Sequence, residues 1–169
     1  MTRAEVKLPE DPLISILPSE LSVVKAWDRA HGYAWLRSGA TDSAAAATAL
    51  ATATKTFNNA INWSDLDQPL GPTLAEMAKA AGKAVGVVTT VPWSHATPAG
   101  LANAHNVSRK NLAELANAML AGEVLDVIMG AGNPDYDDNG APRKVPGDYP
   151  SVGGSDTWRA IEEARARPA

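Results

Sequence analysis

The clearest helical pattern in the chain lies between Thr73 and Gly82. Thr73 and Glu76 have the spacing of a capping box, in which each residue satisfies the other's free backbone N–H group at the start of a helix. Apolar residues then recur at i, i+3, i+4 and i+7, which predicts one buried face made of Leu74, Met77, Ala78 and Ala81. Gly82 suits the end of such a helix.

Nearly continuous apolar runs predict two strands, over residues 84–91 and 124–130. Strands of this kind are typically covered on both faces of a sheet. Between them, a helix is expected from a cap at Ser108 to Gly122, with a buried face of Leu112, Leu115, Ala116 and Met119. A last helix is predicted over residues 156–165. Helices that alternate with buried strands indicate an α/β fold with a parallel sheet.

A third helix is expected directly after Ser43, because the following residues are mostly alanine, the best helix former. Its small side chains would allow close packing against neighbouring strands. The free N–H groups and the positive dipole end of the helix would surround Ser43, which favours a serine nucleophile and a bound phosphate. The alternative is that Asp42 or Ser43 is only the N-cap of this helix.

Composition and charge narrow the classes of function. The chain has 169 residues, 45% of them hydrophobic and 20% charged, as in soluble globular domains. The net charge of -4 argues against a nucleic-acid partner, which would need a basic surface. No apolar run is long enough to span a membrane, and the first residues do not have the pattern of a signal peptide. Prolines punctuate the start of the chain, so residues 1–37 are expected to be irregular.

In a parallel sheet, functional residues gather in loops beyond the carboxyl ends of the strands. The loop after the first predicted strand contains His95 and Thr97, whose imidazole and hydroxyl groups could bind a divalent cation. Two ligands are too few for a metal site, and a histidine in a loop is often only solvated. Arg109 is a natural partner for phosphate, although in the first turn of a helix it could also be a surface charge.

The loop after the second predicted strand begins like a calcium loop, with Asp135, Asp137 and Asn139 at alternate positions. The twelfth position, where a bidentate glutamate belongs, is Pro146. We therefore interpret the segment as a polar turn with at most weak affinity for calcium.

Several motifs together resemble the alkaline phosphatase family in order and spacing. These are TDSAAAATALATATKTFNNAI, TLAEMAKAAGKAVGVVTTV, SHATPAG, NVSRKN and VLDVIMGAG. The resemblance is dense from about residue 38 to residue 133 and fainter towards the C-terminus. It implies a three-layer α/β fold, with a mostly parallel sheet flanked by helices. Residues 38–169 would be a partial catalytic domain with this fold.

The resemblance also implies the role of each site residue. Ser43 would be the nucleophile that is transiently phosphorylated, and Arg109 would bind the phosphate oxygens. Asp42 would orient Arg109, while His95 and Thr97 would contribute to a magnesium site. The family implies zinc and magnesium as cofactors, a phosphate monoester as substrate, a homodimer, and a periplasmic or secreted location.

The chain also departs from the family pattern. The family's metal-binding aspartate before the nucleophile has no counterpart upstream of Ser43, and all three histidines precede Val124, so most zinc ligands are missing. Asp28 and His31 could bind a metal but lie on the wrong side of Ser43. We therefore expect an incomplete domain, cut at both ends, that is poorly stable and has little or no phosphatase activity by itself.

Two other functions stay open at this stage. One is a degenerate domain that binds phosphate or a divalent cation without turnover. The other is a related transferase or sulfatase of the same superfamily, although the sulfatase signature is not seen.

Overall fold

A computed structural model describes residues 41–137, 139–145, 147 and 149–165. These residues belong almost wholly to the compact unit Ser43–Ala169. The segment 1–37 that was expected to be irregular, including Asp28 and His31, lies outside the described residues. The predicted domain boundary between residues 37 and 38 lies outside them too and stays a prediction.

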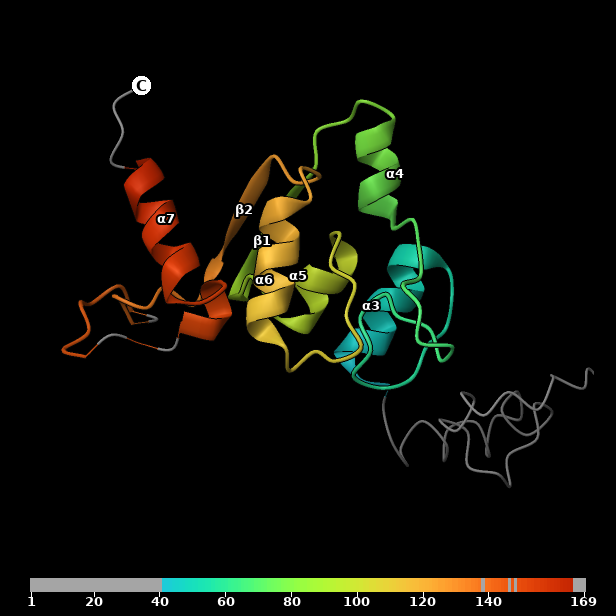
Figure 1. Cartoon of the computed structure of the whole chain (residues 1–169), viewed down its shortest axis with the longest axis horizontal. Helices are drawn as coiled ribbons and strands as arrows, with labels where there is room; N and C mark the ends of the chain where they lie inside the picture. The colour runs from blue at the N-terminus through green and yellow to red at the C-terminus, as the bar shows by residue number, and fades with distance from the viewer. Residues whose placement is uncertain (1–40, 138, 146, 148, 166–169) are drawn as a thin grey trace, which may run out of the picture. The chain divides into compact units, whose positions relative to one another are not determined.

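The sheet is parallel, as the alternation of helices and strands predicted. Strand β1 (Gly86–Pro92) pairs with β2 (Val127–Ala131), and Val87 lies opposite Ile128. Figure 1 shows the two strands side by side. The register shifts before the last pair, Pro92 with Ala131. Proline has no N–H group for the ladder, which fits its position at the end of a strand.

Helix α6 (Leu112–Ala121) covers one face of this sheet. Leu115, Ala116 and Met119 are buried, as their spacing predicted, and Val87 and Ile128 of the strands pack against the same core cluster. The 3-10 helix η2 (Tyr149–Val152) and α7 (Ser155–Arg165) complete this side, and Figure 1 shows them next to each other. The α/β class with a parallel sheet and flanking helices is therefore confirmed.

The other face of the sheet is exposed, which corrects the prediction that both strands are covered on both sides. Along β1 and β2 exposed residues alternate with partly buried ones, and Val88 and Met129 are 75% and 59% exposed. The physical reason is that the described core lies on the side of Val87 and Ile128, so Val88 and Met129 are left largely exposed. The sheet is thus incomplete within the described residues, as the resemblance led us to expect.

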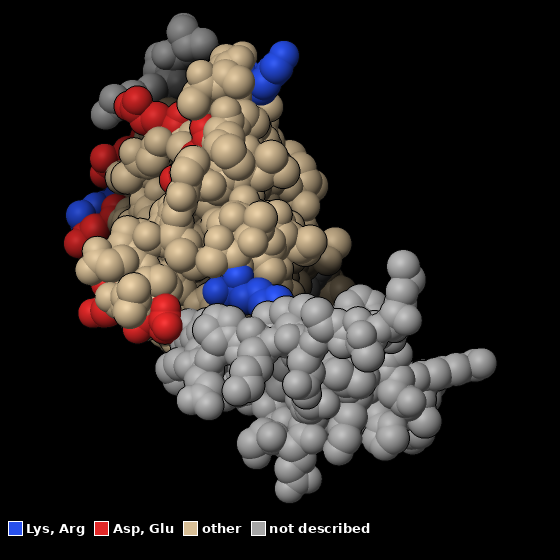
Figure 2. All heavy atoms as spheres, turned by 90° about the vertical axis from the view of Figure 1, so that its right-hand side faces the viewer, with Lys and Arg blue, Asp and Glu red and all other residues tan. Residues whose placement is uncertain are grey.

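Helix α4 (Leu74–Ala80) begins with the predicted capping box, and Gly82 follows it with a left-handed φ of 72°. Its buried face was predicted wrongly, because Leu74 and Met77 are exposed and Ala75 is buried. The cap itself explains this orientation, since Thr73 is fully buried and turns its side of the helix inward. Figure 2 shows the face of the molecule that carries α4, and most of its surface is neither acidic nor basic.

Helix α3 (Ser43–Thr52) forms where the alanine run predicted it. It packs mainly against α5 (Ala96–Leu101), a short helix in the segment that was expected to be a loop. The contact is close, because a Cβ atom added to Gly100 would lie 2.8 Å from the Cβ atom of Ala47. The small side chains of α3 therefore allow contact with a helix, and among the described elements α3 packs mainly against helices α5 and α4 and not, as predicted, against strands.

Candidate functional site

Ser43 is the first residue of α3 and is partly buried. Behind it, Ala44, Ala45 and Ala47 are almost completely buried, so the helix is held by its small side chains. The first turn of a helix has backbone N–H groups without partners inside the helix, and its dipole is positive at this end. Ser43 therefore lies where a bound anion would be stabilised.

Arg109 lies in a turn before α6. The sequence predicted a helix that starts at Ser108, but α6 begins at Leu112, after Asn111. The turn is closed locally, because Ser108 Oγ accepts a hydrogen bond from the Lys110 N–H group at 3.2 Å. The backbone N–H group of Arg109 also donates to the carbonyl oxygen of Asn59 at 2.7 Å. Arg109 is thus placed by a backbone contact with a distant loop.

The guanidinium group of Arg109 brings three predicted site residues together. Its Nη1 atom donates a hydrogen bond to Ser43 Oγ at 2.8 Å, and its Nη2 atom lies 3.2 Å from His95 Nε2. Ser43, His95 and Arg109 come from three separate segments of the chain. A guanidinium group beside a serine hydroxyl at a helix start can hold phosphate against that oxygen.

His95 precedes α5 directly and is partly buried. Burial, followed by the positive charge of Arg109, holds the pKa of its imidazole below the ordinary histidine value. A guanidinium group can only donate, so the Nε2 atom of His95 accepts and the proton of the neutral ring is on Nδ1. The side chain of His95 thus supports Arg109 as a neutral acceptor.

Thr97 does not join this cluster. It is the second residue of α5, and its side chain is exposed. Within the described part of the chain, no three His, Asp or Glu side chains gather where they could hold a metal ion. Because His95 Nε2 already accepts from Arg109, His95 and Thr97 do not fit a metal site by themselves. Asp42 lies directly before α3 and is partly buried.

The loop that resembles a calcium site forms a polar turn, as predicted. The Oδ1 atom of Asp137 accepts hydrogen bonds from the N–H groups of Asn139 and Ala141, both at 2.9 Å. Asp135 Oδ2 accepts from the indole N–H group of Trp158 at 3.1 Å. These carboxylates are therefore used in closing the turn and holding it to α7.

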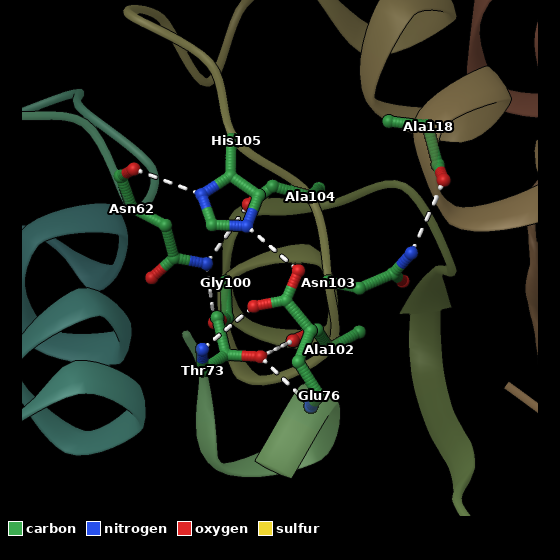
Figure 3. Close-up of polar contacts among 9 residues, drawn as sticks. All are labelled: Asn62, Thr73, Glu76, Gly100, Ala102, Asn103, Ala104, His105 and Ala118. Atoms are coloured by element: carbon green, nitrogen blue, oxygen red, sulfur yellow. Dashed lines mark hydrogen bonds and ion pairs between the residues drawn. The ribbon is translucent and has the colours of Figure 1, made fainter. Parts of the chain in front are cut away.

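Sequence analysis missed a second polar cluster, which Figure 3 shows. The ring of His105 lies between the carboxylate of Glu76, at 3.0 Å, and the carbonyl oxygen of Asn62, at 3.1 Å. Glu76 was assigned to the capping box alone. Its partner His105 follows 29 positions later, a separation at which no local pattern gives a signal.

An apolar hollow of about 380 Å³ lies beside β2 and α7. Its walls include Trp93, Met129, Trp158 and Ile161, and no charged side chain lines it. A phosphate ester needs positive or donating groups, so this hollow does not suit one. The cluster around Arg109 is chemically the better candidate site.

Comparisons with known proteins agree on one family. The sequence profile described as Alkaline phosphatase matches residues 28–152. Alkaline phosphatase 4 of Bacillus subtilis is 45% identical over 97 residues, which cover 54% of this chain and 21% of that protein. The matched part thus spans about a fifth of the length of this relative.

Solved structures give the same result. A cold-active alkaline phosphatase from a Shewanella species matches with a TM-score of 0.53 and 45% identity, over 59% of this chain and 24% of that one. A variant of the TAB5 alkaline phosphatase, solved with Mg bound in its M3 site, matches with a TM-score of 0.51 and 35% identity. That match covers 54% of this chain and 26% of the other. Among the described residues, no helix has the length and apolar character needed to cross a bilayer.

Proposed function

Because this chain belongs to the alkaline phosphatase family, we propose that it supplies the nucleophile and the phosphate-binding arginine of a phosphate monoesterase. The observation that carries the proposal is the hydrogen bond of 2.8 Å between Arg109 Nη1 and Ser43 Oγ. It joins the two residues to which the family resemblance gives these roles. The family match favours an enzyme over a domain that only binds phosphate.

The proposed reaction has two displacements at phosphorus. Ser43 Oγ forms a bond to phosphorus and gives its proton to solvent, while the ester P–O bond breaks and the leaving alkoxide takes a proton from solvent. Water then attacks the phosphoserine and releases inorganic phosphate, which restores Ser43. In both steps Arg109 binds the non-bridging oxygens of the phosphoryl group. Two parallel N–H donors of its guanidinium group stabilise the negative charge on these oxygens.

The supporting residues have separate proposed roles. His95, as a neutral acceptor, fixes the Nη2 side of Arg109 and leaves Nη1 directed at Ser43. Asp42 is proposed to orient Arg109, by family resemblance. By family resemblance His95 and Thr97 are also the proposed magnesium pair. A metal on Nε2 would replace the contact with Arg109, and the pair needs further ligands, because two are too few for a site.

Zinc and magnesium dependence are proposed on the family resemblance. The related TAB5 variant with bound magnesium supports the magnesium part. A homodimer is likewise proposed by resemblance, and sedimentation of the purified chain would test it.

The test is hydrolysis of a chromogenic phosphate monoester at alkaline pH with added zinc and magnesium. Turnover that disappears in Ser43→Ala and after chelation, and persists in Lys110→Gln, would support the proposal. Lys110→Gln removes the neighbouring exposed cation. Isothermal titration with inorganic phosphate separates binding from turnover. Binding without turnover would agree with either an incomplete enzyme or a binding domain, and binding that survives Arg109→Ala would contradict the proposed site.

A further inference from the structure

His105 connects helix α4 to the loop that follows α3, using both ring nitrogens (Figure 3). The partners of these nitrogens, the Glu76 carboxylate and the carbonyl oxygen of Asn62, can only accept hydrogen bonds. Burial raises the pKa of Glu76, but hydrogen bonds from the Thr73 N–H group and from His105 lower it more, so its pKa lies below the ordinary value. Glu76 therefore accepts as a carboxylate, and both ring nitrogens of His105 face acceptors.

Glu76 is itself held in place. Its Oε2 atom accepts a hydrogen bond from the Thr73 N–H group at 2.7 Å, while Oε1 faces His105. The hydroxyl of Thr73 donates to the carbonyl oxygen of Ala102 at 2.7 Å. The backbone of Thr73 thus fixes one carboxylate oxygen, while the other meets the imidazole ring.

Asn62, the other partner of His105, is completely buried. Its Nδ2 atom donates to the carbonyl oxygens of Gly100, at 2.9 Å, and Ala104, at 2.8 Å. Its backbone N–H group donates to Thr48 Oγ1 on α3 at 2.8 Å. Asn62 therefore joins α3, α5 and the segment that leads to His105.

The loop of residues 59–62 also holds the segment that carries Arg109. Ile61 and Asn106 exchange two backbone hydrogen bonds, of 2.9 and 2.8 Å, and the Arg109 N–H group donates to Asn59 at 2.7 Å. Together with the His105 contact, these bonds attach residues 59–62 to the segment of Arg109 at three successive points. His105 forms the end of this series that is tied to α4.

The loop also reaches the helix of the nucleophile. Thr48 Oγ1 lies 3.3 Å from the carbonyl oxygen of Ala60, in addition to its bond with Asn62. Helix α3, which begins at Ser43, and the segment of Arg109 are thus both attached to residues 59–62. The position of this loop sets the relation between the two site residues.

We propose that His105, held by Glu76, is a positioning residue of the phosphate site. It fixes residues 59–62 and through them the backbone of Arg109, and so it determines where the guanidinium group lies relative to Ser43. His105 acts through the backbone of the loop. The inference rests on the proposed function, in which Ser43 and Arg109 bind phosphate.

The first experiment measures amide hydrogen exchange in the full chain by NMR, with and without His105→Gln. We expect the amides of Asn106 and Arg109 to exchange about tenfold faster, because a charge-assisted hydrogen bond that held their partners is lost. The amide of Leu115 in α6, which donates to the carbonyl oxygen of Asn111, should keep its exchange rate. An equal increase at all three amides, or none at Asn106 and Arg109, would overturn the proposal.

Two further variants separate positioning from general support of α4. Glu76→Gln keeps the size of the side chain but weakens its bond with His105, so it should produce the same local pattern even if His105→Gln does not fold. Asp126→Asn removes the ion pair with Lys79, of 2.6 Å, at another part of α4. It should leave the Arg109 amide unchanged, and a matching increase there would assign the effect to α4 as a whole.

Titration with inorganic phosphate gives the second readout. The dissociation constant of the folded protein for phosphate should rise about tenfold in His105→Gln and stay unchanged in Asp126→Asn. The reason is that only His105→Gln is expected to shift the guanidinium group of Arg109. An unchanged constant in His105→Gln would count against positioning. If the original chain binds no phosphate, the proposed function fails, whereas the exchange rates still decide whether His105 positions the Arg109 segment.

Discussion

Arg109 donates a hydrogen bond to Ser43 Oγ across 66 positions of sequence, at 2.8 Å. This contact joins the start of an alanine helix to a turn before α6. Neither segment contains a metal-binding cluster of its own. The candidate site is therefore defined by how accurately the two segments are held together.

Replacing Arg109 with lysine should weaken phosphate binding by about tenfold, because a planar fork of two donors is lost while the charge is kept. Calorimetric titration with inorganic phosphate measures the effect. Lys110→Gln is the matched control, since it removes an adjacent exposed cation and should change the dissociation constant little. No effect of Arg109→Lys together with weaker binding in Lys110→Gln would mean that phosphate responds only to the total charge.

Replacing Thr48 with valine should lower the free energy of unfolding by about 1–3 kcal/mol, because the buried N–H group of Asn62 loses its acceptor. Urea unfolding measures this change. Thr52→Val is the control, since the Thr52 hydroxyl donates to the Thr48 carbonyl oxygen within the same helix and accepts from the exposed N–H group of Thr54. A comparable loss in the control would show that the bond to Asn62 contributes no more to the free energy of unfolding than a hydrogen bond within the helix.

Replacing Gly100 with alanine should destabilise the protein by about 1–3 kcal/mol, since the new methyl group meets Ala47 at 2.8 Å. Thermal or urea unfolding gives the value. The double variant Ala47→Gly with Gly100→Ala moves the methyl group across the contact. Its loss should be smaller than the sum of the two single losses, and simple additivity would speak against the contact.

Acid should remove the contribution of Glu76 to the free energy of unfolding. Its pKa is lower in the folded protein than in the unfolded chain, so its stabilising effect is full above the unfolded value and is lost as the pH falls through the folded value. The stability difference between the original chain and Glu76→Gln should therefore shrink as the pH drops below about 4. Urea unfolding from pH 7 to pH 3 tests this, and a constant difference would contradict it.

The exposed face of the sheet should promote self-association. Val88→Thr with Met129→Gln replaces two exposed apolar side chains and should shift the chain towards smaller species in sedimentation, with little loss of stability. Leu50→Gln on α3 is a control, since Leu50 is 74% exposed and lies away from the strands. An equal shift in the control would attribute association to apolar surface in general.

Local sequence patterns predicted the helices whose signals, such as helix-forming residues and apolar spacing, lie within the helix itself. The alanine run predicted α3, and the spacing of Leu115, Ala116 and Met119 predicted the buried face of α6. The face of α4 was predicted wrongly because the pattern records only apolar spacing. In the molecule, the contacts of Thr73 and Glu76 with distant groups determine which face of α4 is buried.

The candidate site was predicted only in part, because only some of its residues lie in local motifs. Ser43, His95 and Arg109 lie in recognisable motifs, and the structure brings all three together. The roles proposed for them stay predictions, as does the part of Asp42. The cluster of His105 depends on contacts across 29 and 43 positions, which no short motif encodes.

The contact between Ala47 and Gly100 has a consequence for how the site could be redesigned. Ser43 begins α3 one turn before Ala47, and His95 directly precedes α5, the helix of Gly100. The two helices are separated at this pair by little more than one methyl group, so the pair limits how closely the helix starts at Ser43 and His95 can approach each other. Changing the side-chain volume at these two positions would be a means of tuning which anions enter, without altering any group that binds them.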